Sequence, residues 1–134
     1  MPISLKENKY LKLLLLAGAT FFIIEFFLHY FGLSILEHDK IFINTHDRYV
    51  ASFTLAIGTI AILITTDLKK YHDLFILFMA LVLVGIISGT IIALEGGYQT
   101  LFPVVTLDHN LSILGIGFYL WYILTWIIWL KRVK

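Results

Sequence analysis

Two ionisable residues within one apolar stretch, Glu25 and His29, have the types and the spacing that could support chemistry. They lie four residues apart within residues 13–31, so a helix would place both side chains on one face. An ionised carboxylate inside a lipid bilayer is energetically costly, and ionisable residues in membrane-spanning segments are usually functional. The alternative interpretation is a protonated Glu25 that donates a hydrogen bond to a threonine or serine of a neighbouring helix and serves packing alone. In that alternative, His29 is an interfacial side chain that reaches water. The functional interpretation predicts an intramembrane polar site formed by Glu25 and His29.

Further carboxylates and imidazoles lie near the ends of the other apolar segments. In an antiparallel helix bundle they would converge at one mouth, with Glu25 and His29 as its floor. Carboxylates and imidazoles together are ligands for Zn²⁺, Cu²⁺, Mn²⁺ or Fe, and two facing histidines could instead hold a haem. The sequence therefore predicts a possible divalent-metal or haem site at this mouth. The additional candidate ligands are His46, Asp47, Glu95, Asp108 and His109.

Neighbouring histidines and aspartates recur in the chain, and helix capping explains most of them without a metal. An aspartate at a helix start accepts hydrogen bonds from free backbone amides and suits the positive end of the helix dipole. Adjacent residues on a helix do not face each other, so we expect no contact within a pair. Capping does not explain Glu25 with His29, or Glu95 at a helix end, where the dipole disfavours an acid. The pairs at segment starts are His46-Asp47, His72-Asp73 and Asp108-His109.

Four apolar segments must position these groups. The chain is 60% hydrophobic and 14% charged with a mean hydropathy of +0.91, against about 45–50% apolar and ~25% charged residues in soluble domains. A chain of 134 residues cannot hide this excess in a core, so the surplus faces lipid. A bilayer core needs about 20 apolar residues per helix. We predict an all-α, up-down-up-down four-transmembrane-helix bundle forming a single membrane domain over residues 1–134, with spans at 13–31, 49–66, 74–94 and 111–130.

The distribution of lysine and arginine predicts the orientation of this bundle. Eight of the ten basic residues fall on one side of the four predicted spans, and this is the side that usually faces the cytoplasm. Both termini are therefore predicted to be cytoplasmic in a multi-pass inner-membrane protein. The net charge of +1 indicates no nucleic-acid or acidic partner. The eight residues are Lys6, Lys9, Lys12, Lys69, Lys70, Lys131, Arg132 and Lys134.

The two outer connections, residues 32–48 and 95–110, are long enough to be functional or to contain structure of their own. Gly32 is predicted to end the first helix, because glycine adopts the left-handed conformation that terminates helices. Ser34 and Glu37 have the spacing of a capping box for a short interfacial helix. The second connection is apolar enough to dip back toward the membrane.

Small residues at four-residue spacing predict where helices approach closely. Gly85, Gly89 and Ala93 form such a stripe in the third segment, and Thr54 with Gly58 forms a weaker one in the second. We interpret these stripes as packing surfaces within the bundle rather than as a dedicated dimer face.

Short motifs around the second segment carry a resemblance to a known group of proteins. Asp47-Arg48-Tyr49 opens the segment, Asp67-Leu68-Lys69-Lys70-Tyr71 closes it, and a glycine-containing third segment follows. This layout, which covers most of the chain, resembles the small four-helix, DoxX-like bacterial membrane proteins. The chain departs from that group in having no arginine in its third segment. The resemblance implies the four-helix architecture and assigns no chemistry to any residue.

Three functions remain open at this stage. The first is an accessory, scaffold or binding subunit that packs on a membrane protein partner or on a second copy of itself within the lipid bilayer. The second is a metal- or haem-binding redox protein or membrane enzyme, and the third is a proton-coupled binder or transporter of a small lipophilic molecule. The chain has no cysteine, which excludes disulfides and thiolate metal sites, and no phosphate-binding loop, HExxH or GxSxG motif. No residue is assigned a catalytic role.

Overall fold

The computed structural model describes residues 5–33, 44–94 and 109–133, and throughout these ranges the regular structure is helical. The helices are α1 Leu5–Phe31, α2 Asn44–Thr66, α3 His72–Leu94 and α5 His109–Val133. They confirm the all-α class, with one helix for each predicted apolar segment. Each helix begins before its predicted apolar segment, because its first residues are mostly polar and hydropathy does not detect them. The capping box predicted at Ser34 and Glu37 and most of the second outer connection lie outside the described residues.

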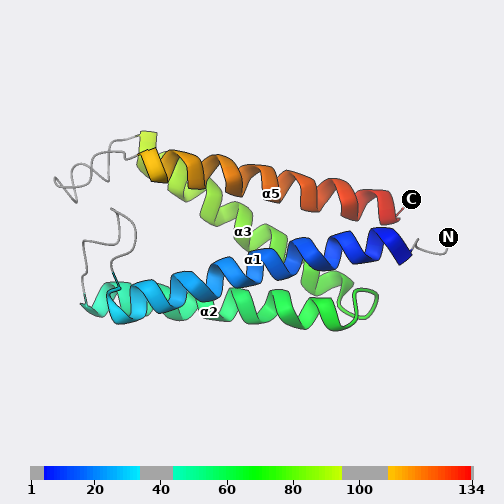
Figure 1. The fold of residues 1–134 in the computed structure, drawn as a ribbon, viewed down its shortest axis with the longest axis horizontal. Coiled ribbons are helices and arrows are strands. Elements are labelled where there is room, and N and C mark those ends of the chain that lie inside the picture. The colour runs from blue at the N-terminus through cyan, green and yellow to red at the C-terminus, as the bar shows by residue number, and fades with distance from the viewer. Residues whose placement is uncertain (1–4, 34–43, 95–108, 134) are drawn as a thin grey trace.

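Successive helices run in opposite directions, as Figure 1 shows. The start of α1, the turn between α2 and α3, and the end of α5 therefore lie at one end of the fold, which we call the basic end. α1 and α2 pack side by side over most of their length, whereas α3 crosses away from them toward the start of α5. The lysines at the basic end whose side chains the structure describes are Lys9, Lys12, Lys69, Lys70 and Lys131.

α1 ends at a glycine, as its sequence predicts. Gly32 has a φ of 65°, and the backbone N–H of Leu33 donates to the carbonyl oxygen of Leu28 at 2.8 Å. This bond is the one that closes a Schellman motif and satisfies a carbonyl at the helix end. A side chain at Gly32 would strain this left-handed backbone.

The turn between α2 and α3 depends on Asp67. Its Oδ1 accepts hydrogen bonds from the backbone N–H groups of Lys69 at 3.1 Å and Lys70 at 3.0 Å, and its carbonyl accepts one from the N–H of Tyr71 at 3.0 Å. The two bonds to Oδ1 hold the pKa of the Asp67 carboxyl below its ordinary value. The Lys70 amide is the largest cause, and the Lys69 amide and the charges of Lys70 and Lys12 add to it. Asp67 thus caps the turn that precedes α3, and Asp73 lies in the first turn of α3, where its capping role stays a prediction.

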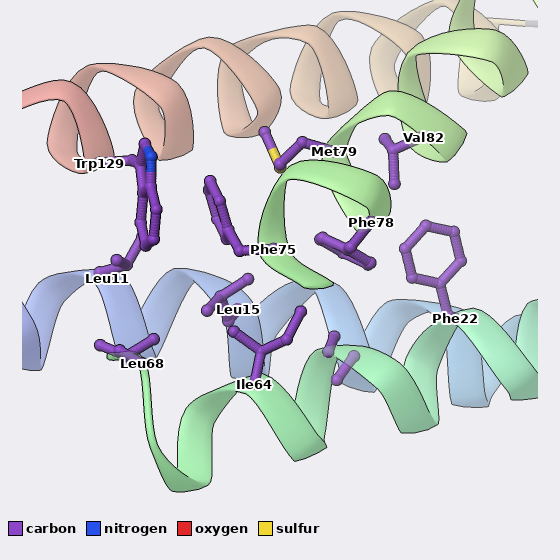
Figure 2. Packing of buried hydrophobic residues seen from close by; sticks show 12 residues of the cluster. Leu11, Leu15, Phe22, Ile64, Leu68, Phe75, Phe78, Met79, Val82 and Trp129 are labelled. Carbon is purple, nitrogen blue, oxygen red and sulfur yellow. The ribbon is translucent and has the colours of Figure 1, made fainter. Parts of the chain in front are cut away.

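Buried side chains from all four helices form a core in the half of the fold nearest the basic end (Figure 2). Phe75 of α3 stacks on Trp129 of α5, with ring centroids 3.9 Å apart and an interplanar angle of 20°. Such aromatic pairs contribute about 0.5–1.5 kcal/mol beyond the area they bury. The buried positions of α3 lie on one helix face and end at Val82. The core residues are Leu11, Leu15, Ala19, Phe22, Ala61, Ile64, Leu68, Phe75, Phe78, Met79, Val82 and Trp129.

Two glycines bring other helices against α1. A Cβ at Gly58 of α2 would lie 3.2 Å from the carbonyl oxygen of Ala19, so the backbones approach as closely there as a small residue permits. A Cβ at Gly18 would run into the indole of Trp121 on α5. That indole also donates from Nε1 to the carbonyl oxygen of Leu14 at 2.8 Å, which joins α5 to the α1 backbone.

The predicted stripe on α3 contrasts with these two sites. No described atom lies within 4 Å of the position of a Cβ at Gly85. The packing partner that we expected for Gly85 within the bundle is therefore not seen in the described residues. Gly89 and Ala93 belong to α3, and their packing stays a prediction.

Large apolar side chains are exposed on all four helices, and in the described residues they outnumber the buried ones. α1 over Lys9–Phe31 and α2 over Asn44–Thr66 are long and apolar enough to cross a membrane. The apolar stretches described in α3 and α5, His72–Ser88 and Gly115–Lys131, are shorter. Soluble monomers rarely leave large contiguous apolar surfaces exposed, so this surface calls for an apolar environment or a partner.

The Asp67 turn predicts how stability depends on pH. Because folding lowers the pKa of Asp67, its contribution is complete above the ordinary carboxyl pKa and is lost as pH falls through the lowered value. We expect Asp67→Ala to lower the melting temperature of the purified protein at pH 7. We also expect the melting temperature of this variant to decrease less than that of the parent when the pH is lowered. Thermal unfolding between pH 7 and pH 3 measures both effects, with Asp67→Asn as the control that keeps the oxygen acceptor and removes the charge. An unchanged melting temperature in Asp67→Ala would contradict this role.

Candidate functional site

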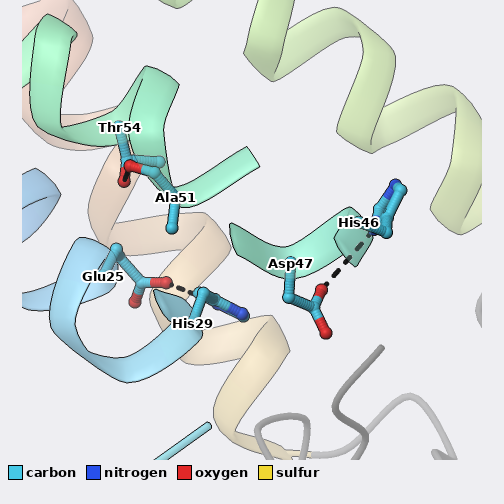
Figure 3. A network of polar contacts seen from close by, with 6 residues as sticks. All are labelled: Glu25, His29, His46, Asp47, Ala51 and Thr54. Atoms are coloured by element: carbon cyan, nitrogen blue, oxygen red, sulfur yellow. Dashed lines mark hydrogen bonds and ion pairs between the residues drawn. The ribbon is translucent and has the colours of Figure 1, made fainter. Parts of the chain in front are cut away.

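Glu25 and His29 form a hydrogen-bonded pair on the covered side of α1. The distance between Glu25 Oε2 and His29 Nε2 is 3.0 Å, and the two side chains are 15% and 25% exposed, respectively. Their neighbour Ile24 is 50% exposed, so the pair lies away from the most open face of the helix. Figure 3 shows the pair at the end of the fold opposite the basic end, where α2 begins beside α1.

The structure changes the alternative interpretation of Glu25. We expected a packing role to involve a threonine or serine of another helix, yet within the described chain the hydrogen bond of Glu25 is made to His29 of its own helix. Thr54, the nearby hydroxyl drawn in Figure 3, donates instead to the carbonyl oxygen of Ala51 at 2.7 Å. The i, i+4 spacing predicted a shared face, and the observed bond agrees with that prediction.

His46 and Asp47 lie in the first turn of α2, near this pair. His46 Nδ1 and Asp47 Oδ1 are 3.5 Å apart; the His46 side chain is 68% exposed, whereas that of Asp47 is 16% exposed. The expectation that adjacent residues do not touch is wrong here, and also for His72 and Asp73, whose Nδ1 and Oδ1 atoms are 3.0 Å apart. Short side chains at a helix start can turn toward each other because no preceding helical turn crowds them.

Arg48 joins the start of α2 to the end of α1, a role that sequence analysis missed. Its Nε donates to the carbonyl oxygen of Tyr30 at 3.2 Å, and its guanidinium lies 5.4 Å from the centroid of the Tyr30 ring. The bond satisfies a carbonyl in the last turn of α1 and places a positive charge at the negative end of the helix dipole. No local sequence signal marks this contact, because 18 residues separate the two partners.

Only some of the residues of the predicted metal or haem site lie within the part of the chain that the structure describes. No group of three histidine, aspartate or glutamate side chains that could hold a metal occurs among the described residues. Glu95 and Asp108 lie outside the described residues, and His109 is the first residue of α5. The metal or haem hypothesis therefore stays a prediction. What the described chain contributes is a hydrogen-bonded carboxylate–imidazole pair.

Comparisons with protein-family models, with curated proteins and with solved structures find no match to this chain. The resemblance to DoxX-like proteins consequently stays a prediction, and the function must be argued from the geometry of the chain itself.

The Glu25–His29 bond predicts energetic coupling between the two residues. In a double-mutant cycle of Glu25→Ala and His29→Ala, we expect a coupling of about 1 kcal/mol, because a partly buried hydrogen bond contributes about that much. The measurement is the free energy of unfolding of the parent, the two single variants and the double variant.

A matched control exists at the other end of the fold. His72 and Asp73 are also 3.0 Å apart but are 46% and 103% exposed, so their cycle should show no measurable coupling. Equal coupling in the two cycles, or none for Glu25 and His29, would contradict a structural bond at this site.

Proposed function

We propose that this protein crosses a membrane four times with its basic end in the cytoplasm, and that it serves there as an accessory or scaffold subunit. The observation that carries the proposal is the exposed apolar surface on all four helices. Two helices already meet the length and hydropathy of a membrane span over their described residues. Lipid would cover this surface without the cost of contact with water.

The hydrogen bonds that serine and threonine hydroxyls make on the described helices support a location in an apolar environment. Eight of them donate to a backbone carbonyl three or four residues earlier in the same helix. A bilayer core offers no water to hydroxyl groups, so bonds within the helix are the arrangement it requires. The eight residues are Thr20, Ser52, Thr54, Thr59, Thr65, Thr66, Thr90 and Thr125.

The separation of charge supports the orientation. The described lysines of α1, of the α2–α3 turn and of α5 lie at the basic end, and Arg48 lies at the opposite end. Positive loops remain cytoplasmic during membrane insertion, which favours cytoplasmic termini.

Open surface beyond the core supports the accessory role. Val82 is the last fully buried residue of α3 among the described side chains, and beyond it Val84 and Ile87 are exposed while Ile86 still packs against the core. A Cβ at Gly85, Gly115 or Gly117 would contact no described atom. Small residues beside exposed aliphatic side chains let another helix approach closely, so this part of α3 and α5 suits a partner within the membrane.

The topology is testable by cysteine labelling, because the chain has no cysteine of its own. We expect a membrane-impermeant maleimide to label Lys40→Cys in intact cells, and to label Lys70→Cys and Lys134→Cys only after permeabilisation. The parent chain is the unlabelled control, and resistance to extraction by alkaline carbonate tests integration. Labelling of Lys70→Cys in intact cells would reverse the orientation, and extraction by carbonate would reject the membrane assignment.

Two matched glycine substitutions test the accessory role. Gly85→Leu should leave thermal stability unchanged, because the added side chain meets open space, yet should disrupt a complex detected on native gels of solubilised membranes. Gly58→Leu should instead lower stability by about 1–3 kcal/mol, because it overpacks the contact with α1. A parent that migrates as a monomer, or a Gly85→Leu complex of unchanged size, would contradict the proposal.

A further inference from the structure

The most concentrated charge in the fold lies at the basic end, where three separate parts of the chain bring lysines together. Lys9 and Lys12 come from α1, Lys69 and Lys70 from the α2–α3 turn, and Lys131 from the last part of α5. The net charge of +1 for the whole chain hides this cluster, because most of the acidic residues lie elsewhere in the sequence.

None of these five lysines forms an ion pair with a carboxylate among the described residues. Asp67 interacts electrostatically with Lys70 and Lys12, and its Oδ1 already accepts the backbone amides of Lys69 and Lys70. Lys70 Nζ lies 5.2 Å from the centroid of the Tyr71 ring, a contact that leaves its N–H donors able to bind an anion. At the basic end, five described lysine side chains therefore outnumber two described carboxylates, those of Asp67 and Asp73, which leaves an excess of positive charge.

Exposed apolar side chains directly adjoin this surface. Leu13 and Leu16 follow Lys12 on α1, and Leu130 precedes Lys131 on α5; all three are exposed. Tyr10 is exposed at the same level, as aromatic residues at a membrane interface commonly are. A ligand that meets both kinds of surface must carry an anionic head and an apolar body.

We propose that the basic end binds the headgroups of anionic phospholipids, with Lys12, Lys69, Lys70 and Lys131 contacting phosphate while the acyl chains lie against the exposed leucines. This inference rests on the proposed membrane location and names a partner for it. A basic residue at an anionic membrane surface strengthens binding by about fivefold. Binding of this kind weakens as salt screens the charges.

The test is lipid binding by the purified protein in a neutral detergent, measured by native mass spectrometry. The probes are dioleoyl phosphatidylglycerol and dioleoyl phosphatidylcholine, which share acyl chains and differ in net charge. We expect the parent to prefer phosphatidylglycerol, and Lys69→Gln/Lys70→Gln to lose at least fivefold of that preference. The control is Lys40→Gln/Arg48→Gln, which removes the two basic residues of the first outer connection and should keep the preference. A parent without preference, or an equal loss in both variants, would overturn the proposal.

A free phosphate is the other ligand that this chemistry could accept. We expect sodium phosphate to displace no more phosphatidylglycerol than sodium chloride at the same ionic strength. Stronger displacement by phosphate would overturn the assignment to lipid. Carbonate extraction separates this inference from the membrane proposal: a protein that stays in carbonate-washed membranes but shows no lipid preference contradicts the inference alone.

Discussion

The close approach of α2 to α1 at Gly58 is the contact on which the arrangement of the polar site depends. A Cβ there would lie 3.2–3.3 Å from the carbonyl oxygen of Ala19 and the side chains of Phe22 and Ile23, so a larger residue would push the two helices apart. With the two helices this close, the start of α2 lies beside the end of α1. Arg48 can then reach the carbonyl of Tyr30, and Glu25 and His29 become partly covered.

Polar groups in this protein are satisfied locally, and this shapes how its helices associate. Hydroxyls bond to their own helix, and Glu25 bonds to His29 one turn away. Few polar bonds are therefore left to join helices, and those described come mainly from α5. Trp121 donates to Leu14 of α1, Tyr122 donates to Met79 of α3 at 3.2 Å, and Tyr119 contacts the hydroxyl of Thr90. The remaining cohesion comes from aromatic stacking and small-residue packing, which work in lipid as well as in water.

The two ends of the fold differ in kind. The basic end combines the aromatic core with five lysines that form no ion pair among the described residues, so it is both the best-packed part and the most positively charged part of the described chain. The opposite end holds the Glu25–His29 pair, where α3 and α5 extend beyond the last buried residue of α3. This division suits a molecule anchored at one membrane surface and open to a partner toward the other, as proposed above.

The sequence by itself determined the helices, their order and one of their ends. Long apolar stretches can satisfy their backbone only as helices, so hydropathy located all four, and Gly32 marked the end of α1 because its backbone is left-handed. The spacing of Glu25 and His29 also predicted their shared face, because i, i+4 geometry is local.

Only the tertiary structure decided which glycine packs and which polar groups meet. Gly58 lies tightly against α1 and Gly85 is open although both belong to small-residue stripes, since α2 packs along α1 whereas α3 crosses away from both. The partner of Arg48, the indole of Trp121 beside Gly18, and the capping of the α2–α3 turn by Asp67 likewise depend on how side chains are placed in space. Composition and periodicity describe one helix at a time, whereas these contacts depend on the distance and angle between helices or on the path of a turn.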